Sequence, residues 1–372
     1  MIYVDVSAAV HGRAGLGRYS QRLAAALADE LPSELALFYN RGRDGRLPQS
    51  LARLPRRSVS LGYKPWRSAI LLAQLARISF ARLVPDVRLY HSTEHLLFPL
   101  PDRPTVLTVH DLIFKLFPAY HKRLNYWYLN LAMPLFCRRA TAIIAVSEAS
   151  KRDIITHYGI EASKIHVIYE AAGPAFQPPD PNDIARVRAK YRLPDSYLVH
   201  LGTLEPRKNL VRLLETLQAL RRQRPALHLV LVGSRGWLYE DFFARLAADG
   251  LEEAVVTLGW VSDEDLPAVL AAAELAVQPS LYEGFGLPLL EQMAVGQVVA
   301  ASDRASLPEV GGEAAAYFDP VNTEDMIAVV DRLLGDADEK EHRRRLGLER
   351  AAQFSWRRAA RETKALYEQL LH

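Results

Sequence analysis

The stretch Glu283-Gly-Phe-Gly-Leu-Pro-Leu-Leu-Glu291 follows closely on the apolar run Leu275-Ala-Val-Gln-Pro279. The apolar run predicts a buried strand. Pro288 suits the first turn of a helix, because the amide hydrogen that proline lacks would be unpaired there. A buried strand that passes through a glycine turn into a helix indicates an α/β fold with a parallel sheet.

The same stretch predicts an anion-binding site bracketed by two carboxylates. Small glycines let a ligand approach the backbone, and the free amides at a helix start, with the helix dipole behind them, suit a phosphate or a sugar oxyanion. Glu283 lies before the turn and Glu291 lies about one turn into the helix. Carboxylates beside an anion site are explained if they accept hydrogen bonds from hydroxyl groups on either side of it. A nucleotide-sugar has that layout, with ribose hydroxyls, a diphosphate and then sugar hydroxyls.

Length and composition predict a soluble protein of two domains, with three left open. The 372 residues are 49% hydrophobic and 24% charged, which is typical of globular proteins. The single cysteine, Cys137, excludes an intramolecular disulfide and a cysteine-only metal site and fits a reducing cytoplasm. Asp5 and polar residues near the start argue against a signal peptide. No window reaches the roughly 18 apolar residues that a membrane-spanning helix needs.

Charge is distributed unevenly along the chain. Residues 1–180 contain 23 Lys and Arg against 14 Asp and Glu, whereas acidic residues are in excess in the remainder. The basic half predicts an anionic partner, such as a membrane surface or a phosphate-bearing acceptor. A basic solvated face with no partner is the alternative. Nucleic-acid binding is not expected, because the basic residues are spread out without interleaved aromatic residues.

Strand-like and helix-like runs alternate in both halves of the chain. The expected strands are Ile2–Ser7, Leu35–Tyr39, Val106–Val109 and Ala142–Val146 in the first half, and Tyr197–Leu201, Leu227–Val232, Val255–Leu258, Leu275–Val277 and Val298–Ala301 in the second. This alternation predicts a parallel, doubly wound sheet in each half. The prolines of residues 174–194 predict a linker between the halves. We therefore expect domains at residues 1–175 and 190–354, followed by a final helix at 355–372 with Ser355 as its N-cap.

Two segments of the first half have distinctive compositions. Residues 45–64 are rich in Arg, Pro and Gly and predict a mobile loop. Residues 66–83 predict a helix with apolar residues and flanking arginines. Such a helix either packs its apolar side on the core or lies on a membrane interface, and core packing is the more frequent case.

A second charged motif opens the second half. The stretch Gly202-Thr-Leu-Glu-Pro-Arg-Lys-Asn209 ends one expected strand and begins a helix. Ligands of open α/β sheets bind at the carboxyl ends of strands. Arg207 offers a planar fork for phosphate oxygens and Lys208 a compact positive charge, which together suit a diphosphate leaving group. The alternative is a solvated basic pair at a helix start.

Three motifs together resemble the family-four retaining glycosyltransferases. They are Gly202–Asn209, the run Pro279-Ser-Leu-Tyr-Glu-Gly-Phe-Gly-Leu-Pro-Leu-Leu-Glu291, and Ser306-Leu-Pro-Glu-Val310. The resemblance covers nearly the whole chain and is densest over residues 197–319. It implies the GT-B fold, in which two Rossmann-like doubly wound domains face a central cleft. The first domain would lie on the acceptor side, the second would bind the nucleotide-sugar, and the final helix would pack back on the first.

The resemblance also implies roles for the charged residues of the second half. Arg207 and Lys208 would neutralise the donor diphosphate and act in catalysis. Glu283 would hold the transferred hexose and act in catalysis, and Glu291 would hold the ribose hydroxyls. The backbone amides implied to bind the hexose and its phosphate belong to Gly284, Phe285, Gly286 and Leu287.

Further donor-site positions are implied by the same likeness. Val261 and the loop after Gly233 would line the base pocket. His110, within the run Thr-Val-His-Asp of residues 108–111, matches a family histidine that faces the donor sugar and acts in catalysis; a capped loop histidine is the structural alternative. Gly15 and Gly17 match the family's first glycine loop, which closes over phosphate or acceptor.

Some features depart from this pattern or suggest other chemistry. Many family members have an Asn-Gly pair where this chain has Tyr169-Glu-Ala-Ala-Gly173, although Glu170 could face the cleft. Two Asp-x-Asp triplets, at 263–265 and 336–338, could in principle bridge Mg²⁺ to a diphosphate. Ser262 and Asp265 instead resemble a helix start, and the cations already supply the charge. We therefore expect no metal site and no cofactor beyond the nucleotide-sugar co-substrate.

The resemblance implies transfer of a hexose with retention of configuration, independent of metal. Retention by double displacement needs a carboxylate below the sugar, and none is evident, so front-face attack is favoured. The likeness to bacterial mannosyltransferases of surface-polysaccharide assembly makes GDP-mannose the expected donor, with UDP-glucose second. The expected acceptor is a glycan or a lipid-linked glycan, met in the cytoplasm by an enzyme in peripheral contact with the inner face of the membrane. A nucleotide-sugar epimerase or hydrolase, or a non-catalytic scaffold, are the alternatives.

Overall fold

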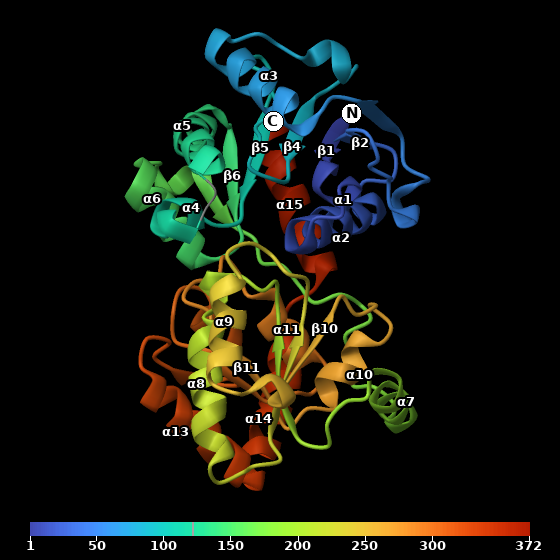
Figure 1. The fold of residues 1–372 in the computed structure, drawn as a ribbon. Coiled ribbons are helices and arrows are strands. Elements are labelled where there is room, and N and C mark those ends of the chain that lie inside the picture. Colours follow the sequence, from blue (N-terminus) through green and yellow to red (C-terminus); the bar gives the residue numbers. More distant parts are fainter. Residues whose placement is uncertain (121–122) are drawn as a thin grey trace. The chain divides into compact units, whose positions relative to one another are not determined.

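The computed structural model describes residues 1–120 and 123–372, which form two compact units with one sheet each (Figure 1). The first domain consists of Met1–Glu170 and Ser355–His372, and the second of Ala171–Phe354. Both sheets are parallel throughout, and their inner strands are buried. Buried parallel strands read as continuous apolar runs because helices cover both faces. The predicted α/β architecture of two Rossmann-like domains is confirmed.

The first-domain sheet has the strand order β3-β2-β1-β4-β5-β6-β7. Its strands are β1 (Ile2–Asp5), β2 (Leu35–Asn40), β3 (Arg56–Val59), β4 (Leu89–Ser92), β5 (Thr105–Val109), β6 (Ala142–Ala145) and β7 (Ile165–Val167). Its helices are α1 (Ser7–Val10), α2 (Ala14–Glu30), α3 (Tyr63–Ala76), α4 (Ile113–Leu116), α5 (Arg123–Arg139), α6 (Glu148–Tyr158) and α15 (Trp356–Leu371). Strand β1 pairs with both β2 and β4, so the strand order reverses there and creates a topological switch point.

The second-domain sheet has the strand order β10-β9-β8-β11-β12-β13. Its strands are β8 (Tyr197–Leu201), β9 (His228–Val232), β10 (Val255–Gly259), β11 (Leu275–Gln278), β12 (Val299–Ser302) and β13 (Ala316–Phe318). Its helices are α7 (Pro181–Tyr191), α8 (Leu210–Arg221), α9 (Glu240–Ala248), α10 (Leu266–Ala271), α11 (Leu287–Ala294), α12 (Leu307–Gly311), α13 (Thr323–Gly335) and α14 (Ala337–Ala351). The switch point lies between β8 and β11, which are neighbours in the sheet.

The last helix, α15, belongs to the first domain and packs against α2 (Figure 1, red). Ser355 is its N-cap, as predicted, and accepts a hydrogen bond from the amide of Arg358. Further along the helix, the buried Tyr367 hydroxyl lies 2.6 Å from Nδ1 of His91 on β4. The helix is therefore fastened to the sheet of the first domain as well as to α2.

Three local predictions are wrong. The expected loop at residues 45–64 contains strand β3. Its exposed residues Arg56 and Arg57 are both charged, so the sequence lacks the alternation of apolar and polar residues that predicts a strand. The expected helix 66–83 ends at Ala76, because Arg77 adopts a left-handed conformation with φ of 56°. The expected linker 174–194 contains helix α7, whose first residue Pro181 suits a first turn and whose N-cap is Asp180.

The predicted glycine loop near the start of the chain is also different in the structure. Helix α2 begins at Ala14, so Gly15 and Gly17 lie in its first turns. A Cβ atom on Gly17 would be 3.0 Å from the carbonyl oxygen of Ala8 in α1. Gly17 therefore allows the two helices to approach closely, which is a packing role for a residue expected in a loop.

None of the helices in the described part of the chain is long and apolar enough to cross a membrane.

Candidate functional site

The carboxyl ends of β8 and β11 bring the two predicted charged motifs together in the second domain. The amide of Leu281 donates to the carbonyl of Arg207 at 2.9 Å, and Asn209 Nδ2 donates to the carbonyl of Pro279 at 3.1 Å. Arg207 Nη1 also donates to the carbonyl of Tyr282 at 2.7 Å. The loop after β8 is thus tied to the loop after β11 at the switch point of the sheet.

Arg207, Lys208 and Glu283 form a buried charged cluster in these loops. Glu283 Oε2 lies 2.7 Å from Arg207 Nη1, and Glu283 Oε1 lies 2.6 Å from Lys208 Nζ. Arg207 Nη2 makes a second ion pair with Glu205 at 2.5 Å. Two cations and two carboxylates therefore balance one another in this cluster.

The protonation states of this cluster follow from burial and mutual attraction. Burial alone would raise the pKa of Glu283, but the charges of Arg207 and Lys208 outweigh it and bring the pKa to about 2. Burial and the neighbouring Arg207 charge lower the pKa of Lys208, which Glu283 and Glu205 partly counteract. Glu283 is ionised at neutral pH and serves as the counterion of both cations.

His200 on β8 is a buried neighbour of the cluster that sequence reasoning missed. Its Nδ1 lies 3.0 Å from the carbonyl oxygen of Val277, and its Nε2 is buried without a hydrogen-bond partner among the described residues. A Cβ atom on Gly202 would lie 3.2 Å from His200 Nε2 and 3.4 Å from Lys208 Nζ, so the glycine leaves room for both side chains. Burial, then the charge of Lys208, lowers the pKa of His200 to about 4. The available signal was a histidine at a strand end just before a glycine.

The turn after β11 has the geometry that its glycines predict. Gly286 is the N-cap of α11 with φ of 104°, and a Cβ atom there would lie 2.9 Å from Leu307 Cδ2. Ser306 Oγ lies 2.9 Å from the carbonyl oxygen of Glu283 and 2.8 Å from that of Phe285. The Ser306 hydroxyl therefore fixes the backbone of the turn by hydrogen bonds to two of its carbonyl groups. Glu291 is buried on α11 one turn beyond it.

The remaining predicted positions of the second domain lie on the loops of the neighbouring strands. Val261 is buried two residues after the end of β10. Gly233 follows β9, and a Cβ atom on it would lie 2.0 Å from the carbonyl oxygen of Gly202. No side chain fits at Gly233, so the backbones after β8 and β9 meet. Gly284, Phe285 and Leu287 lie in the turn described above.

His110 lies in the first domain, where it forms an ion pair with Glu170. His110 Nδ1 is 3.0 Å from Glu170 Oε1, and Nε2 is 3.0 Å from the carbonyl oxygen of Thr93. Both partners are acceptors, so the doubly protonated ring satisfies both contacts. Burial would lower the pKa of His110, but the hydrogen bond and charge of Glu170 raise it above its usual value. Tyr19 of α2 packs edge-on against the ring at 4.6 Å.

Glu170 lies in the stretch that departs from the family pattern, so the resemblance assigned no role to it. It is buried, and it is sixty residues away from His110 in the sequence. The structure places it as the partner that orients and charges His110. No local sequence motif predicts such a pair. His110 follows β5, Glu170 lies sixty residues further along the chain, and the two meet only in the folded domain.

The two Asp-x-Asp triplets have structural roles. Asp265 accepts hydrogen bonds from Arg186 at 2.5 Å, Lys190 at 2.6 Å and Tyr191 at 2.7 Å, which joins α7 to the start of α10. Asp336 caps α14 by accepting from the amide of Glu339. In the described part of the chain, no group of three His, Cys, Asp or Glu residues is arranged to hold a metal ion.

Family models match both domains of the chain. The model described as glycosyltransferase family 4 matches residues 13–172, and that described as glycosyl transferases group 1 matches residues 183–351. O-antigen chain mannosyltransferase B of Escherichia coli is 34% identical over 96% of this chain and 96% of its own length. The chain belongs to the family-four glycosyltransferases.

Other relatives and solved structures agree with this membership. The serotype-specific mannosyltransferase WbdA of Escherichia coli is 32% identical over 77% of this chain and 37% of its own length. An MMP alpha-(1->4)-mannosyltransferase of Mycolicibacterium hassiacum is 34% identical over 63% of this chain and 55% of its own length. Anabaena HepE in complex with UDP and glucose superposes with a TM-score of 0.76 at 20% identity, and covers 99% of both chains. WaaG, a glycosyltransferase of lipopolysaccharide biosynthesis, superposes with a TM-score of 0.74 at 16% identity and covers 98% of both. The fold of this glycosyltransferase is therefore GT-B.

Proposed function

We propose that this glycosyltransferase moves mannose from GDP-mannose to a glycan or lipid-linked glycan of surface-polysaccharide assembly. The observation that carries the proposal is the buried cluster of Arg207, Lys208 and Glu283 beside the helix start at Gly286. Two cations and a helix start suit a diphosphate, and the adjoining carboxylates suit hydroxyl groups. The mannosyltransferase names of the relatives support mannose as the transferred sugar.

Donor binding would rearrange the charges of the cluster. A diphosphate entering the site competes with Glu283 for Arg207 and Lys208, because these cations are already neutralised by carboxylates. As the phosphate oxygens take over the cations, the Glu283 carboxylate becomes available to accept hydrogen bonds from sugar hydroxyls. The residue would exchange one set of partners for another without changing its protonation state.

The same geometry favours front-face transfer with retention. A double displacement needs a carboxylate whose oxygen is available to attack the anomeric carbon. Glu283, once released from the cations that hold its oxygens at 2.7 and 2.6 Å, would be occupied by the sugar hydroxyls, and no other carboxylate is assigned to the anomeric carbon. In front-face attack, the departing diphosphate takes the acceptor proton while Arg207 and Lys208 stabilise its growing charge. His110, whose pKa is raised above its usual value by Glu170, would assist in catalysis.

The remaining features of the proposal concern partners and place. We propose that no metal or cofactor takes part, since Arg207 and Lys208 supply the positive charge that a metal would otherwise bring. Gly15 and Gly17 at the start of α2 would approach donor or acceptor. The basic first domain would contact the anionic inner face of the membrane from the cytoplasm, and nucleic acid is not a partner.

The test is a thermal-shift titration with GDP, UDP, ADP, GDP-mannose and UDP-glucose, each with and without Mg²⁺. A ligand that binds only the folded state raises the unfolding temperature according to its concentration and affinity. Stabilisation by GDP and GDP-mannose, independent of Mg²⁺, is the expected result. Stabilisation by UDP and UDP-glucose alone would show that the donor is UDP-glucose rather than GDP-mannose. A release assay for free mannose or an epimer separates transfer from hydrolysis and epimerisation, and no shift with any nucleotide would contradict the proposal.

A further inference from the structure

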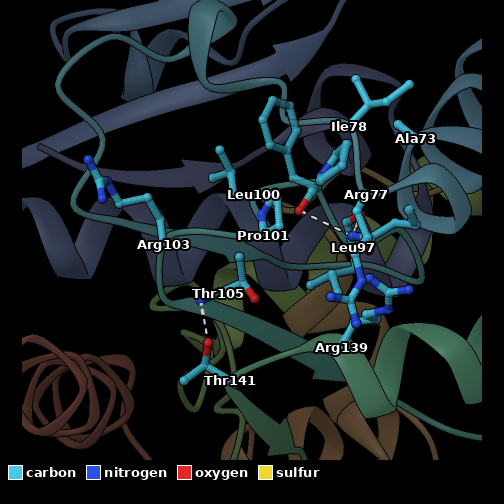
Figure 2. Close-up of a pocket in the computed structure, with 13 residues that line it drawn as sticks. Ala73, Arg77, Ile78, Leu97, Leu100, Pro101, Arg103, Thr105, Arg139 and Thr141 are labelled. Carbon is cyan, nitrogen blue, oxygen red and sulfur yellow. Dashed lines mark hydrogen bonds between the residues drawn. The ribbon is translucent and has the colours of Figure 1, made fainter.

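A hollow of about 210 Å³ lies in the first domain, outside the site described above (Figure 2). Three arginines line it: Arg77 just after α3, Arg103 just before β5, and Arg139 at the end of α5. In Figure 2, Arg103 lies on one side of the hollow and Arg77 and Arg139 on the other. Thr105 and Thr141 add hydroxyl groups to the wall.

The hollow lies at the amino-terminal end of β5, whereas His110, the candidate catalytic residue of this domain, lies at its carboxyl end. Thr105 is the first residue of β5, whereas His110 directly follows its last residue. A strand of this length separates its two ends by about 16 Å at ~3.3 Å per residue. The hollow therefore does not belong to the acceptor side of the transfer site.

The guanidinium groups around the hollow have no acidic partners in the described part of the chain. None of Arg77, Arg103 and Arg139 forms an ion pair with a carboxylate among the residues that the structure describes. The Arg103 guanidinium donates to the backbone carbonyl of Asp102, at 3.1 Å. Arg139 is half-buried, so part of its charge is shielded from water. Planar guanidinium groups around a cavity with hydroxyl donors match the oxygens of a phosphate group.

An exposed apolar face adjoins this basic hollow. Helix α3 buries Trp66 and Ile70 in the core, but Leu72 and Leu75 are 64% and 54% exposed. Ile78, which lines the hollow, is 56% exposed. The left-handed turn at Arg77 ends the helix there, so a basic and an apolar residue adjoin at the rim. One face of this helix therefore packs on the core, as the first of the two alternatives predicted. The opposite face exposes apolar side chains that are available for an interface.

The combination identifies the chemistry of the partner. Exposed aliphatic side chains next to unpaired basic ones are the composition of a surface that enters the headgroup region of an anionic bilayer. A volume of about 210 Å³ is smaller than the roughly 300–1,000 Å³ of pockets for drug-sized ligands. The hollow therefore suits a phosphate-bearing headgroup better than a whole nucleotide-sugar.

We propose that the hollow between Arg77, Arg103 and Arg139 binds the headgroup phosphate of an anionic phospholipid, while Leu72, Leu75 and Ile78 enter the membrane interface. This inference rests on the peripheral membrane contact proposed above and gives it a specific site. It does not depend on the transfer reaction, because vesicle binding needs no turnover.

The experiment is co-sedimentation of the full chain with phosphatidylglycerol vesicles and, separately, with phosphatidylcholine vesicles. The test variants are Arg77→Gln/Arg103→Gln/Arg139→Gln and Leu72→Ser/Leu75→Ser/Ile78→Ser. The matched control is Arg43→Gln/Arg53→Gln/Arg57→Gln, which removes the same charge from exposed arginines of the same domain. The nucleotide-induced thermal shift of each variant shows whether it is folded and whether the donor site is intact.

The wild-type chain and the control are expected to bind phosphatidylglycerol vesicles and not phosphatidylcholine vesicles. The arginine variant should bind on the order of a hundredfold more weakly, at roughly fivefold for each basic side chain near an anionic surface. The serine variant should also lose binding. Equal loss in the control, or unchanged binding of the arginine variant, would overturn the proposal. Saturable binding of inorganic phosphate that needs the three arginines, without vesicle binding, would assign the hollow to a soluble phosphate compound and overturn the lipid assignment.

Discussion

Lys208 Nζ lies 2.6 Å from Oε1 of Glu283, and both side chains are buried between the loops that follow β8 and β11. The lysine and the glutamate belong to different motifs, and the fold makes them one site. Because Glu283 also holds Arg207, the cluster is electrically balanced before a donor arrives. A donor that brings a diphosphate must redistribute these contacts, so each member of the cluster should have a separable effect on binding or turnover.

Replacing Lys208 by alanine should lower turnover without unfolding the protein. In the proposed mechanism, the substitution removes a cation that would stabilise the charge of the departing diphosphate, and loss of one such preorganised contact typically costs about a hundredfold or more in rate. Glu283 keeps Arg207 as its counterion at 2.7 Å, so it is not left as a lone buried charge. Single-turnover rates with a saturating donor measure the effect. Lys340→Ala, which removes a lysine of a surface ion pair, is the control, and near-normal turnover of Lys208→Ala would exclude the diphosphate role.

Replacing Glu291 by alanine should mainly weaken nucleotide binding. Glu291 is a buried carboxylate on α11. If it accepts hydrogen bonds from ribose hydroxyls, as the family resemblance implies, it adds binding energy to the donor and to the nucleotide product alike. The dissociation constant for the nucleotide should rise about tenfold or more, whereas turnover at a saturating donor should change less. Isothermal titration calorimetry with the nucleotide found in the thermal-shift experiment gives the dissociation constant. Unchanged affinity would remove Glu291 from the ribose site.

Replacing Glu170 by glutamine should lower the pKa of His110. The hydrogen bond and charge of Glu170 raise that pKa against the effect of burial, so a neutral partner leaves burial to dominate. The folded-state pKa lies above the unfolded value, so the pair contributes stability that is present below the unfolded pKa and lost as pH rises through the folded pKa. The ring proton resonances of His110, followed by NMR against pH, report the change directly. Glu161→Gln, at an exposed glutamate of the same domain, should leave the His110 titration where it is; an identical curve in Glu170→Gln would show that Glu170 does not set the protonation.

Replacing Asp265 by asparagine should destabilise the second domain in a pH-dependent way. The hydrogen bonds from Lys190, Arg186 and Tyr191 hold the pKa of Asp265 below its usual value. A lowered folded-state pKa contributes stability that is present above the unfolded pKa and lost as pH falls. Near neutral pH the variant should unfold about 2–4 °C below the wild type, and the difference should shrink in acid. Calorimetric scans across pH test this, with Asp263→Asn as the neighbouring control; a difference that stays constant in acid would contradict the assigned cause.

The strands that carry the site were predictable because a strand buried on both faces consists of a short run of apolar residues. Strands β8 and β11 are completely buried, and both were expected within a residue or two of their observed bounds. Strand β3 was missed because it is an edge strand with exposed arginines, and an edge needs no apolar alternation. The left-handed residue that ends α3 is an arginine, which gives no stop signal of the kind that glycine gives.

Within the site, the sequence predicted which residue types occur but not how they pair. The anion cradle at Gly286 follows from local chemistry, since a glycine with positive φ and a following proline mark the helix start. The pairings of Glu283 with Lys208 and of His110 with Glu170 span 75 and 60 residues, and only the strand order brings them together. The burial of His200 against the cluster was also not predicted, because a histidine at a strand end before a glycine is only a weak signal: an apolar strand with one histidine looks the same whether or not that histidine faces a ligand.

Removing divalent metals should leave transfer unchanged. Asp265, the most plausible metal ligand by its triplet motif, is held by Arg186, Lys190 and Tyr191, and Asp336 is committed to capping α14. The charge that Mg²⁺ would contribute to a diphosphate is available from Arg207 and Lys208. Initial rates measured after EDTA treatment, and again after Mg²⁺ is restored, should agree within about twofold, since no step of positioning or charge stabilisation is then assigned to an ion. A rate that collapses in EDTA and recovers with Mg²⁺ would show that the arginine and lysine do not suffice for the leaving group.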